Sequence, residues 1–187
     1  MSNRSKKSSK AKNKTEKNIF DAISAEDAFT ILKILAEKDI NIAKEIEQIT
    51  KEYLSKVDLD EIALDVYYEL DGLDVEELWD KSGSSRYGYV EPADQAWDMI
   101  EELLEPFLEK LRKYRKLSMN KEAKFYCMGI LKGIYKYEKE STSEFKDWAV
   151  DIPGECFETV VNDWKKNCKN PKDIKEMDDF ITKNILW

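Results

Sequence analysis

Hydrophobic residues recur three and four positions apart along most of the chain, which places them on one face of an α-helix. In residues 24–38, Ser24 and Asp27 have the spacing of an N-terminal capping pair. The face predicted to be buried contains Ala28, Ile31, Leu32 and Leu35. A second stripe, after a short break, contains Ile42, Ile46, Ile49, Tyr53 and Leu54. These segments predict a helix, a tight turn and a second helix.

The same pattern continues from residue 58. Asp58 is predicted to cap a helix that ends at Gly72 in a left-handed conformation. Its predicted buried face contains Ile62, Val66, Tyr67 and Leu70. A short helix follows, capped by Asp74, and its spacing predicts that Leu78 and Trp79 face inward.

The two longest helices follow one another in the chain. Pro92 suits the first turn of a helix that extends to about residue 117, with a kink or break expected at Pro106. The next helix is predicted to begin with Ser118 or Asn120 as its cap. It is apolar most of the way round, at Phe125, Cys127, Met128, Ile130, Leu131, Ile134 and Tyr135. Such a helix is expected at the centre of a fold.

Few residues in the chain favour turns, since it has six Gly and four Pro in 187 residues. Pro153, Gly154 and Pro171 are expected to separate the last helical segments. We predict an all-α fold of about eight helices in stacked antiparallel hairpins, forming a short α-solenoid or an irregular helical bundle. Residues 19–187 are predicted to form a single domain.

Charge divides the chain into two parts. Residues 1–18 contain seven Lys or Arg and one Glu, so they carry +6 of a net charge of −8, and the remainder carries −14. We predict a disordered basic tail. It is either a solvated end or an electrostatic tether to an acidic partner such as nucleic acid. The acidic body would repel phosphate.

Several kinds of chemistry are excluded by composition. Histidine is absent, which removes nucleophile–His–acid triads and His-ligated zinc or haem. Cys127, Cys156 and Cys168 lack the spacing of a zinc site and are interpreted as buried or free thiols in a reducing cytoplasm. No run of 18 apolar residues occurs, so no membrane association is expected. We predict no catalytic, metal-binding or cofactor-binding residue, and no cofactor.

Carboxylates give one alternative chemistry. Glu101 and Glu105 share a helix face, as a carboxylate-only Mg²⁺ site or a glycosidase pair would require. They lie on a polar stripe, so we interpret them as a solvated face.

The one basic zone of the body comprises residues 111–116 together with Lys121, Lys124, Lys132, Lys136 and Lys139. Arg112, Lys113 and Arg115 surround Tyr114, and interleaved bases and aromatics can bind single-stranded nucleic acid. The same composition is ordinary at a helix C-terminus, where cations favour the helix dipole.

A loop and a glycine pair form the remaining candidate site. Gly129 and Gly133 are expected to admit a close neighbour, either an aromatic from the 83–91 loop or the helix that begins at Pro92. The alternative is a small ligand bound against this face. Arg86, Tyr87 and Tyr89 are the large side chains of that loop. Either the tyrosines pack over the glycines, or Arg86 and one tyrosine form an exposed recognition tip.

The pattern "DLDEIALDVYYELDGLDVEELWDKSG…YGYVEPADQAWDMIEELLEPFLEKLRKY…CMGILKGIYKYEKE" resembles a helical region of uncharacterised prokaryotic proteins, over roughly residues 57–165. Some of those proteins carry SWIM-type zinc-finger segments elsewhere. The Cys and His ligands of such a finger are absent here, so the resemblance implies no zinc or DNA role. The N-terminal hairpin resembles HEAT-type repeats, which implies an interaction scaffold.

The leading functional hypothesis is a non-enzymatic helical scaffold that offers a groove to a protein partner. The alternative is a nucleic-acid-associated protein that uses the basic tail and the 111–116 patch. A carboxylate-only enzyme is the third hypothesis. The sequence specifies neither the partner nor the oligomeric state.

Overall fold

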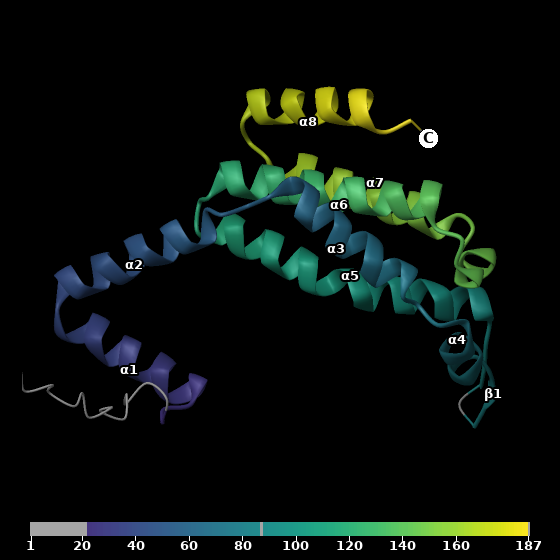
Figure 1. The fold of residues 1–187 in the computed structure, drawn as a ribbon, viewed down its shortest axis with the longest axis horizontal. Coiled ribbons are helices and arrows are strands. Elements are labelled where there is room, and N and C mark those ends of the chain that lie inside the picture. The colour runs from purple at the N-terminus through teal and green to yellow at the C-terminus, as the bar shows by residue number, and fades with distance from the viewer. Residues whose placement is uncertain (1–21, 87, 187) are drawn as a thin grey trace, which may run out of the picture. The chain divides into compact units, whose positions relative to one another are not determined.

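Eight α-helices make up most of the described chain, which confirms the all-α prediction. The computed structural model describes residues 22–86 and 88–186, so the predicted tail and Tyr87 lie outside the described residues. The helices are α1 (Ala25–Lys38), α2 (Ile40–Leu54), α3 (Leu59–Asp71), α4 (Val75–Lys81), α5 (Pro92–Lys116), α6 (Asn120–Glu140), α7 (Ile152–Asn167) and α8 (Pro171–Asn184) (Figure 1). Two short strands, β1 (Gly83–Ser85) and β2 (Gly88–Val90), and a 3₁₀ turn, η2 (Glu144–Trp148), complete the elements.

The internal contacts divide the chain into two units, Met1–Thr50 and Lys51–Trp187. Among the described residues, every buried side chain belongs to the second unit, beginning with Leu54. The first unit holds α1 and most of α2. The prediction of one domain over residues 19–187 stays a prediction.

Local capping follows the sequence closely. The Ser24 hydroxyl accepts a hydrogen bond from the Asp27 amide, and the Asp27 carboxylate accepts one from the Ser24 amide, each at 3.1 Å. Asp58 accepts from two amides at the start of α3, and Asp74 accepts from one at the start of α4. These predicted caps are confirmed, because each depends only on residues two or three positions apart.

Some helix ends differ from the prediction. Gly72 has a φ of −80° and is right-handed, whereas Ser118 has a φ of 57° and is left-handed. The Met119 and Ser118 amides donate to the Tyr114 and Arg115 carbonyls, which is the Schellman pattern that ends α5. The residue before α6 is Met119, with no side-chain cap, so the predicted caps Ser118 and Asn120 were wrong.

The prolines lie within or at the start of helices. α5 continues through Pro106 without a break, and the alternative of a kink there stays a prediction. Pro153 and Gly154 lie in the first turn of α7, and Pro171 lies in the first turn of α8. A proline in the first turn leaves no hydrogen bond unmade, so these residues mark the starts of the last two helices as predicted.

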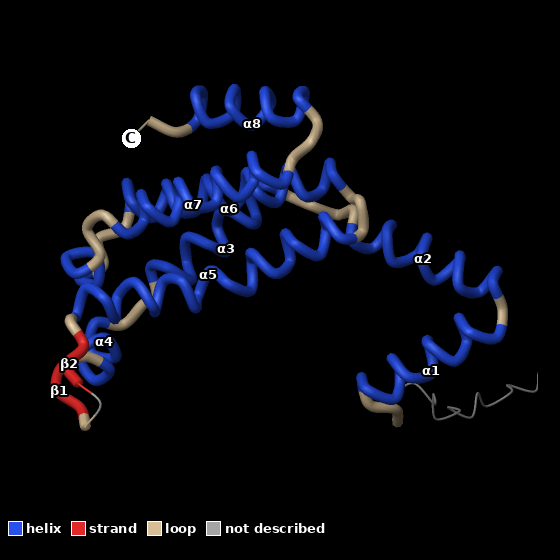
Figure 2. Tube along the Cα trace, turned by 180° about the vertical axis from the view of Figure 1, so that it is seen from behind, coloured by secondary structure: helices blue, strands red, loops and turns tan. Residues whose placement is uncertain are grey.

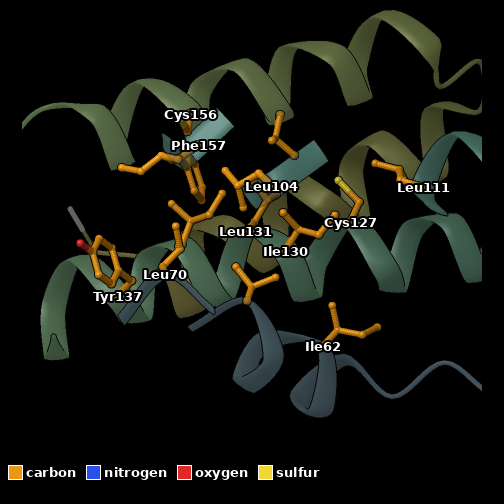
Figure 3. Close-up of a cluster of buried hydrophobic side chains, with 14 of the residues drawn as sticks. Ile62, Leu70, Leu104, Leu111, Cys127, Ile130, Leu131, Tyr137, Cys156 and Phe157 are labelled. Atoms are coloured by element: carbon orange, nitrogen blue, oxygen red, sulfur yellow. The ribbon is translucent and has the colours of Figure 1, made fainter. Parts of the chain in front are cut away.

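α6 is the centre of the second unit, as its apolar sequence predicts. It contacts α3, α5, α7 and α8, and eleven of its residues are buried. α8 lies over α6 and α7 on the side away from α5 (Figures 1 and 2). Leu104 of α5, Leu131 of α6 and Phe157 of α7 come together in the core (Figure 3). In a solenoid each repeat contacts only the repeats next to it in sequence. Here α3, α5, α7 and α8 all contact α6, so the arrangement is a helical bundle.

Candidate interaction surfaces

The 82–92 loop is a two-stranded hairpin next to α4 (Figure 2). Ser84 pairs with Tyr89 across the antiparallel strands, and Gly83 and Gly88 both have positive φ values. Arg86 is exposed, and the Tyr89 side chain is 62% exposed. Tyr89 therefore does not pack into the core. A recognition role for this tip stays a prediction.

The glycine pair of α6 receives a different neighbour from the one expected. A Cβ atom built on Gly129 would lie 2.8 Å from the Ile62 side chain, and one on Gly133 would lie 2.6 Å from Val66 Cβ. Both neighbours belong to α3. Neither Tyr89 nor α5 is the close neighbour, so the expectation was wrong for both, and Tyr87 lies outside the described residues. The glycines are explained by close packing of two helices.

The arginines of the predicted basic patch are held in ion pairs. Arg112 donates to both oxygens of Glu105, at 2.7 and 3.0 Å, and Arg115 donates to Asp163 at 2.6 Å. Lys113 is exposed on the same helix. The pairing lowers the positive charge that residues 111–116 can offer to phosphate.

An acidic groove of 580 Å³ separates α5 from α7. Asp98, Glu101, Glu102 and Glu105 line it from α5. The hydrogen bonds from Arg112 hold the pKa of the Glu105 carboxyl below its ordinary value. Glu105 therefore stays ionised near neutral pH and is not suited to act as a general acid, the role that a glycosidase pair requires of one member.

The α1–α2 hairpin leaves its apolar side chains exposed. α1 has no buried residue. The prediction that one face of each helix is buried was wrong for most of the residues named. Seven large hydrophobic side chains of the first unit are exposed: Phe29, Ile31, Leu32, Ile34, Leu35, Ile40 and Ile49. Two adjacent helices alone cannot cover an apolar stripe this wide. Monomeric proteins rarely expose contiguous apolar patches larger than a few hundred Å².

A second cavity, of 490 Å³, lies where α5 and α7 end and α6 and α8 begin. Its wall includes Arg115, Asn120, Trp164, Lys169 and Asp173. The Arg115 guanidinium lies over the Trp164 ring, with Cζ 5.6 Å from the ring centroid. Trp164 and Lys169 were not among the predicted site residues. The wall comes from four separate segments, which no local pattern reveals.

Lys124 is a buried cation that the sequence pattern could have indicated. Its side chain is 8% exposed and binds Asp173 at 2.6 Å, and it also binds Glu176. Burial alone lowers the pKa of the Lys124 ammonium, but the hydrogen bonds to Asp173 and Glu176 outweigh it, so the pKa is raised. Lys124 precedes Cys127 and Met128 by three and four positions, which places it on the apolar face of α6.

Two of the three cysteines of the chain, Cys127 and Cys156, are buried. Burial raises the pKa of the Cys127 thiol to about 12 and that of Cys156 to about 11. A thiol that keeps its proton is a poor nucleophile. No three Cys, Asp or Glu side chains gather in a metal-binding arrangement within residues 22–86 and 88–186. No helix there is long and apolar enough to cross a membrane.

Comparison with protein-family models, with curated proteins and with solved structures finds no match. The resemblance to a helical region of prokaryotic proteins stays a prediction.

Proposed function

We propose that this protein is a non-enzymatic interaction protein, in which the α1–α2 hairpin offers an apolar surface to a protein partner. The observation that carries the proposal is the exposure of α1, an amphipathic helix with no buried residue. Phe29 is 58% exposed and Ile49 is 57% exposed. Covering such side chains releases ordered water and favours association.

The polar residues of the hairpin are compatible with a protein partner. Acidic and basic side chains both occur on α1 and α2, as at Lys33, Glu37, Lys44 and Glu47. An apolar centre with a polar rim is the ordinary composition of a protein–protein interface. Nucleic acid, in contrast, is bound through positive charge, and the pairing of Arg112 and Arg115 with acids weakens that alternative.

The experiment is affinity capture with the full-length chain from nuclease-treated extracts of the source cells. Wild type is compared with a variant that carries Phe29→Glu and Ile49→Glu. The control is Leu64→Glu, at a residue of α3 that is also exposed, at 42%. We expect one protein to be recovered by wild type and by the control but lost with the double variant, because charges on the hairpin oppose burial.

Equal recovery by all three proteins would contradict the proposal. A parallel capture uses extract without nuclease. Recovery from that extract alone, weakening steeply with salt, would favour the nucleic-acid alternative. Light scattering measures the molar mass of the purified chain. A dimer mass would show that a second copy of the protein covers the hairpin, whereas a monomer mass would point to a different partner.

A further inference from the structure

Two tryptophans with exposed rings lie against one another where α4, η2 and α5 come into contact. The ring centroids of Trp79 and Trp148 are 4.6 Å apart, in an edge-to-face arrangement. Trp79 is 48% exposed and Trp148 is 37% exposed. Val150, two residues further along the chain, is 70% exposed. Large apolar side chains that gather at a protein surface in this way are typical of binding sites.

A cavity of 440 Å³ lies beside this pair, between the first turns of α5 and the segment that joins η2 to α7. Trp148 and Val150 line it, together with the half-buried Trp97 of α5. Its wall is therefore largely aromatic and aliphatic. We refer to the cavity and to the side chains of Trp79, Trp97, Trp148 and Val150 as the tryptophan face.

The charged residues that line this cavity in the described chain are all acidic. They are Asp94, Asp147 and Asp151, and all three are exposed. None of the three forms an ion pair or a side-chain hydrogen bond with another described residue. Lys146, the neighbour of Asp147 in the chain, is already engaged, because its ammonium donates to the Glu138 carbonyl at 2.7 Å. The described part of the chain thus supplies no counter-charge to these carboxylates.

The rings of the tryptophan face also lack a cation, unlike other aromatic rings of this protein. The Lys136 ammonium, for example, lies 4.9 Å from the centroid of the Tyr67 ring. No Lys or Arg of the described residues lies over the three tryptophan rings of the face. Tryptophan is the aromatic side chain that attracts cations most strongly. Rings and carboxylates that both lack a cation are complementary to a positive group supplied by another molecule.

A lysine or arginine side chain has the chemistry that matches this surface. Its aliphatic stem packs against apolar atoms, while its charged end stays near carboxylates and water. The apolar surface continues outside the cavity onto Trp79, so it can also contact the residues that flank such a side chain in a peptide. Nucleic acid is disfavoured, because the three aspartates repel phosphate.

We propose that the tryptophan face binds a basic segment of a partner protein. A lysine or arginine of that segment enters the cavity, and its stem packs against Trp148 and Val150. Its positive charge is attracted by the three aspartates and by the faces of the rings. All of these residues belong to the second unit, so the proposal does not depend on the α1–α2 surface.

The test measures the binding of labelled peptides to the full-length protein by fluorescence anisotropy. In the first peptide lysine alternates with alanine, and in the second and third arginine or glutamate replaces the lysine. The ionic strength is kept at about 50 mM, because salt screens exposed charges. We expect saturable binding of the lysine peptide, of the arginine peptide or of both, and none of the glutamate peptide.

Two charge-matched variants show whether the acids of the cavity are responsible. The cavity variant carries Asp147→Asn and Asp151→Asn and is expected to bind about fivefold more weakly, because two attractive charges are lost. The control carries Asp65→Asn and Glu69→Gln on α3, where both acids are exposed and line none of the cavities described above. It loses the same charge and is expected to bind nearly as wild type does.

A second pair of variants examines the aromatic contribution. Trp148→Ala is expected to weaken binding about threefold or more, because a cation–π contact is lost. Tyr68→Ala is the matched control, since Tyr68 is also exposed and also lies edge-to-face against a neighbouring ring, that of Tyr67. If Trp148→Ala does not fold, Trp79→Ala replaces it, with weaker binding again expected.

Four results would overturn the proposal. The first is the absence of binding by both basic peptides at about 1 mM, where even weak complexes form. The second is equal weakening by the cavity variant and by the α3 control, which would show a general attraction to the acidic body. The third is equal binding by Trp148→Ala and Tyr68→Ala. The fourth is a dimer mass in light scattering that falls to a monomer mass in Trp148→Ala, because a second copy of the chain would then cover the face.

Discussion

At Gly129 and Gly133 of α6, α3 lies too close to leave room for a side chain. A methyl group on Gly133 would lie 2.6 Å from Val66 Cβ and 2.7 Å from the Ala63 carbonyl oxygen. The oxygen belongs to the backbone of α3, so it cannot move without shifting that helix. The glycines cost roughly 1 kcal/mol each in helix propensity, which the closer packing of α3 offsets.

We predict that Gly133→Ala lowers the free energy of unfolding by about 1–3 kcal/mol, because overpacking outweighs the gain in helix propensity. Urea denaturation followed by circular dichroism measures the change. Gly154→Ala is the control, since nothing lies within 4 Å of the added methyl group, and it should be neutral or slightly stabilising. A Gly133→Ala protein as stable as wild type would show that α3 is not held so closely.

At the scale of elements, α8 is attached to the bundle by the buried Met177, by the partly buried Phe180 and Ile181, and by ion pairs. Met177 is fully buried. Lys124 of α6 pairs with Asp173 in a largely buried contact and also with the exposed Glu176. Lys165 of α7 pairs with Asp178 at the surface. Removing one partner of a buried pair leaves an uncompensated charge, while surface pairs contribute little.

We predict that Lys124→Met lowers the free energy of unfolding by about 2 kcal/mol or more and speeds amide exchange in α8, because Asp173 loses its cation. Lys165→Met, the control, should cost about 1 kcal/mol or less, since both partners are half-exposed. Hydrogen-exchange mass spectrometry measures both. Equal exchange of α8 in the two variants would contradict the assigned role of Lys124.

The pH dependence of this attachment follows from the raised pKa of Lys124. A cation with a raised pKa contributes its full stabilisation below the ordinary lysine value and loses it as the pH rises through the higher one. α8 in the wild-type protein is therefore expected to lose protection only in strongly alkaline solution.

At the scale of the whole molecule, the two units differ in what stabilises them. The buried residues of the described chain all lie in Lys51–Trp187, around α6. In Met1–Thr50 the described helices have exposed apolar faces and no core of their own. Short helices without tertiary packing are marginal in water. We infer that the second unit carries the thermodynamic stability and that the first unit depends on what covers it.

We predict that a chain lacking residues 1–50 still unfolds cooperatively, with a Tm within a few degrees of the full-length value, because it keeps every buried residue. Near-ultraviolet circular dichroism during heating measures this. A chain lacking residues 171–187 is the contrast and should be clearly destabilised, since Met177 and Ile185 are buried. A fall in Tm of more than about 10 °C on removing residues 1–50 would show that the first unit shares the core.

The sequence by itself determined the helices and several of their first turns. Ser24, Asp58 and Asp74 act on amides two or three residues away, so their role can be read locally. The apolar circumference of α6 likewise predicted its central position. The same local reasoning failed at Gly72 and Ser118, where the direction of the next segment decides which residue is left-handed.

Only the tertiary structure decided what each surface contacts. A stripe of apolar residues favours burial but does not identify the neighbouring helix. The packing of α3 against Gly129 and Gly133 was therefore not predicted. Nor was the exposure of the apolar face of α1. The 490 Å³ cavity is lined by four segments between Arg115 and Asp173, which come together only when the chain folds. Periodicity acts within one helix, whereas pairing of helices depends on shape and charge between residues far apart in sequence.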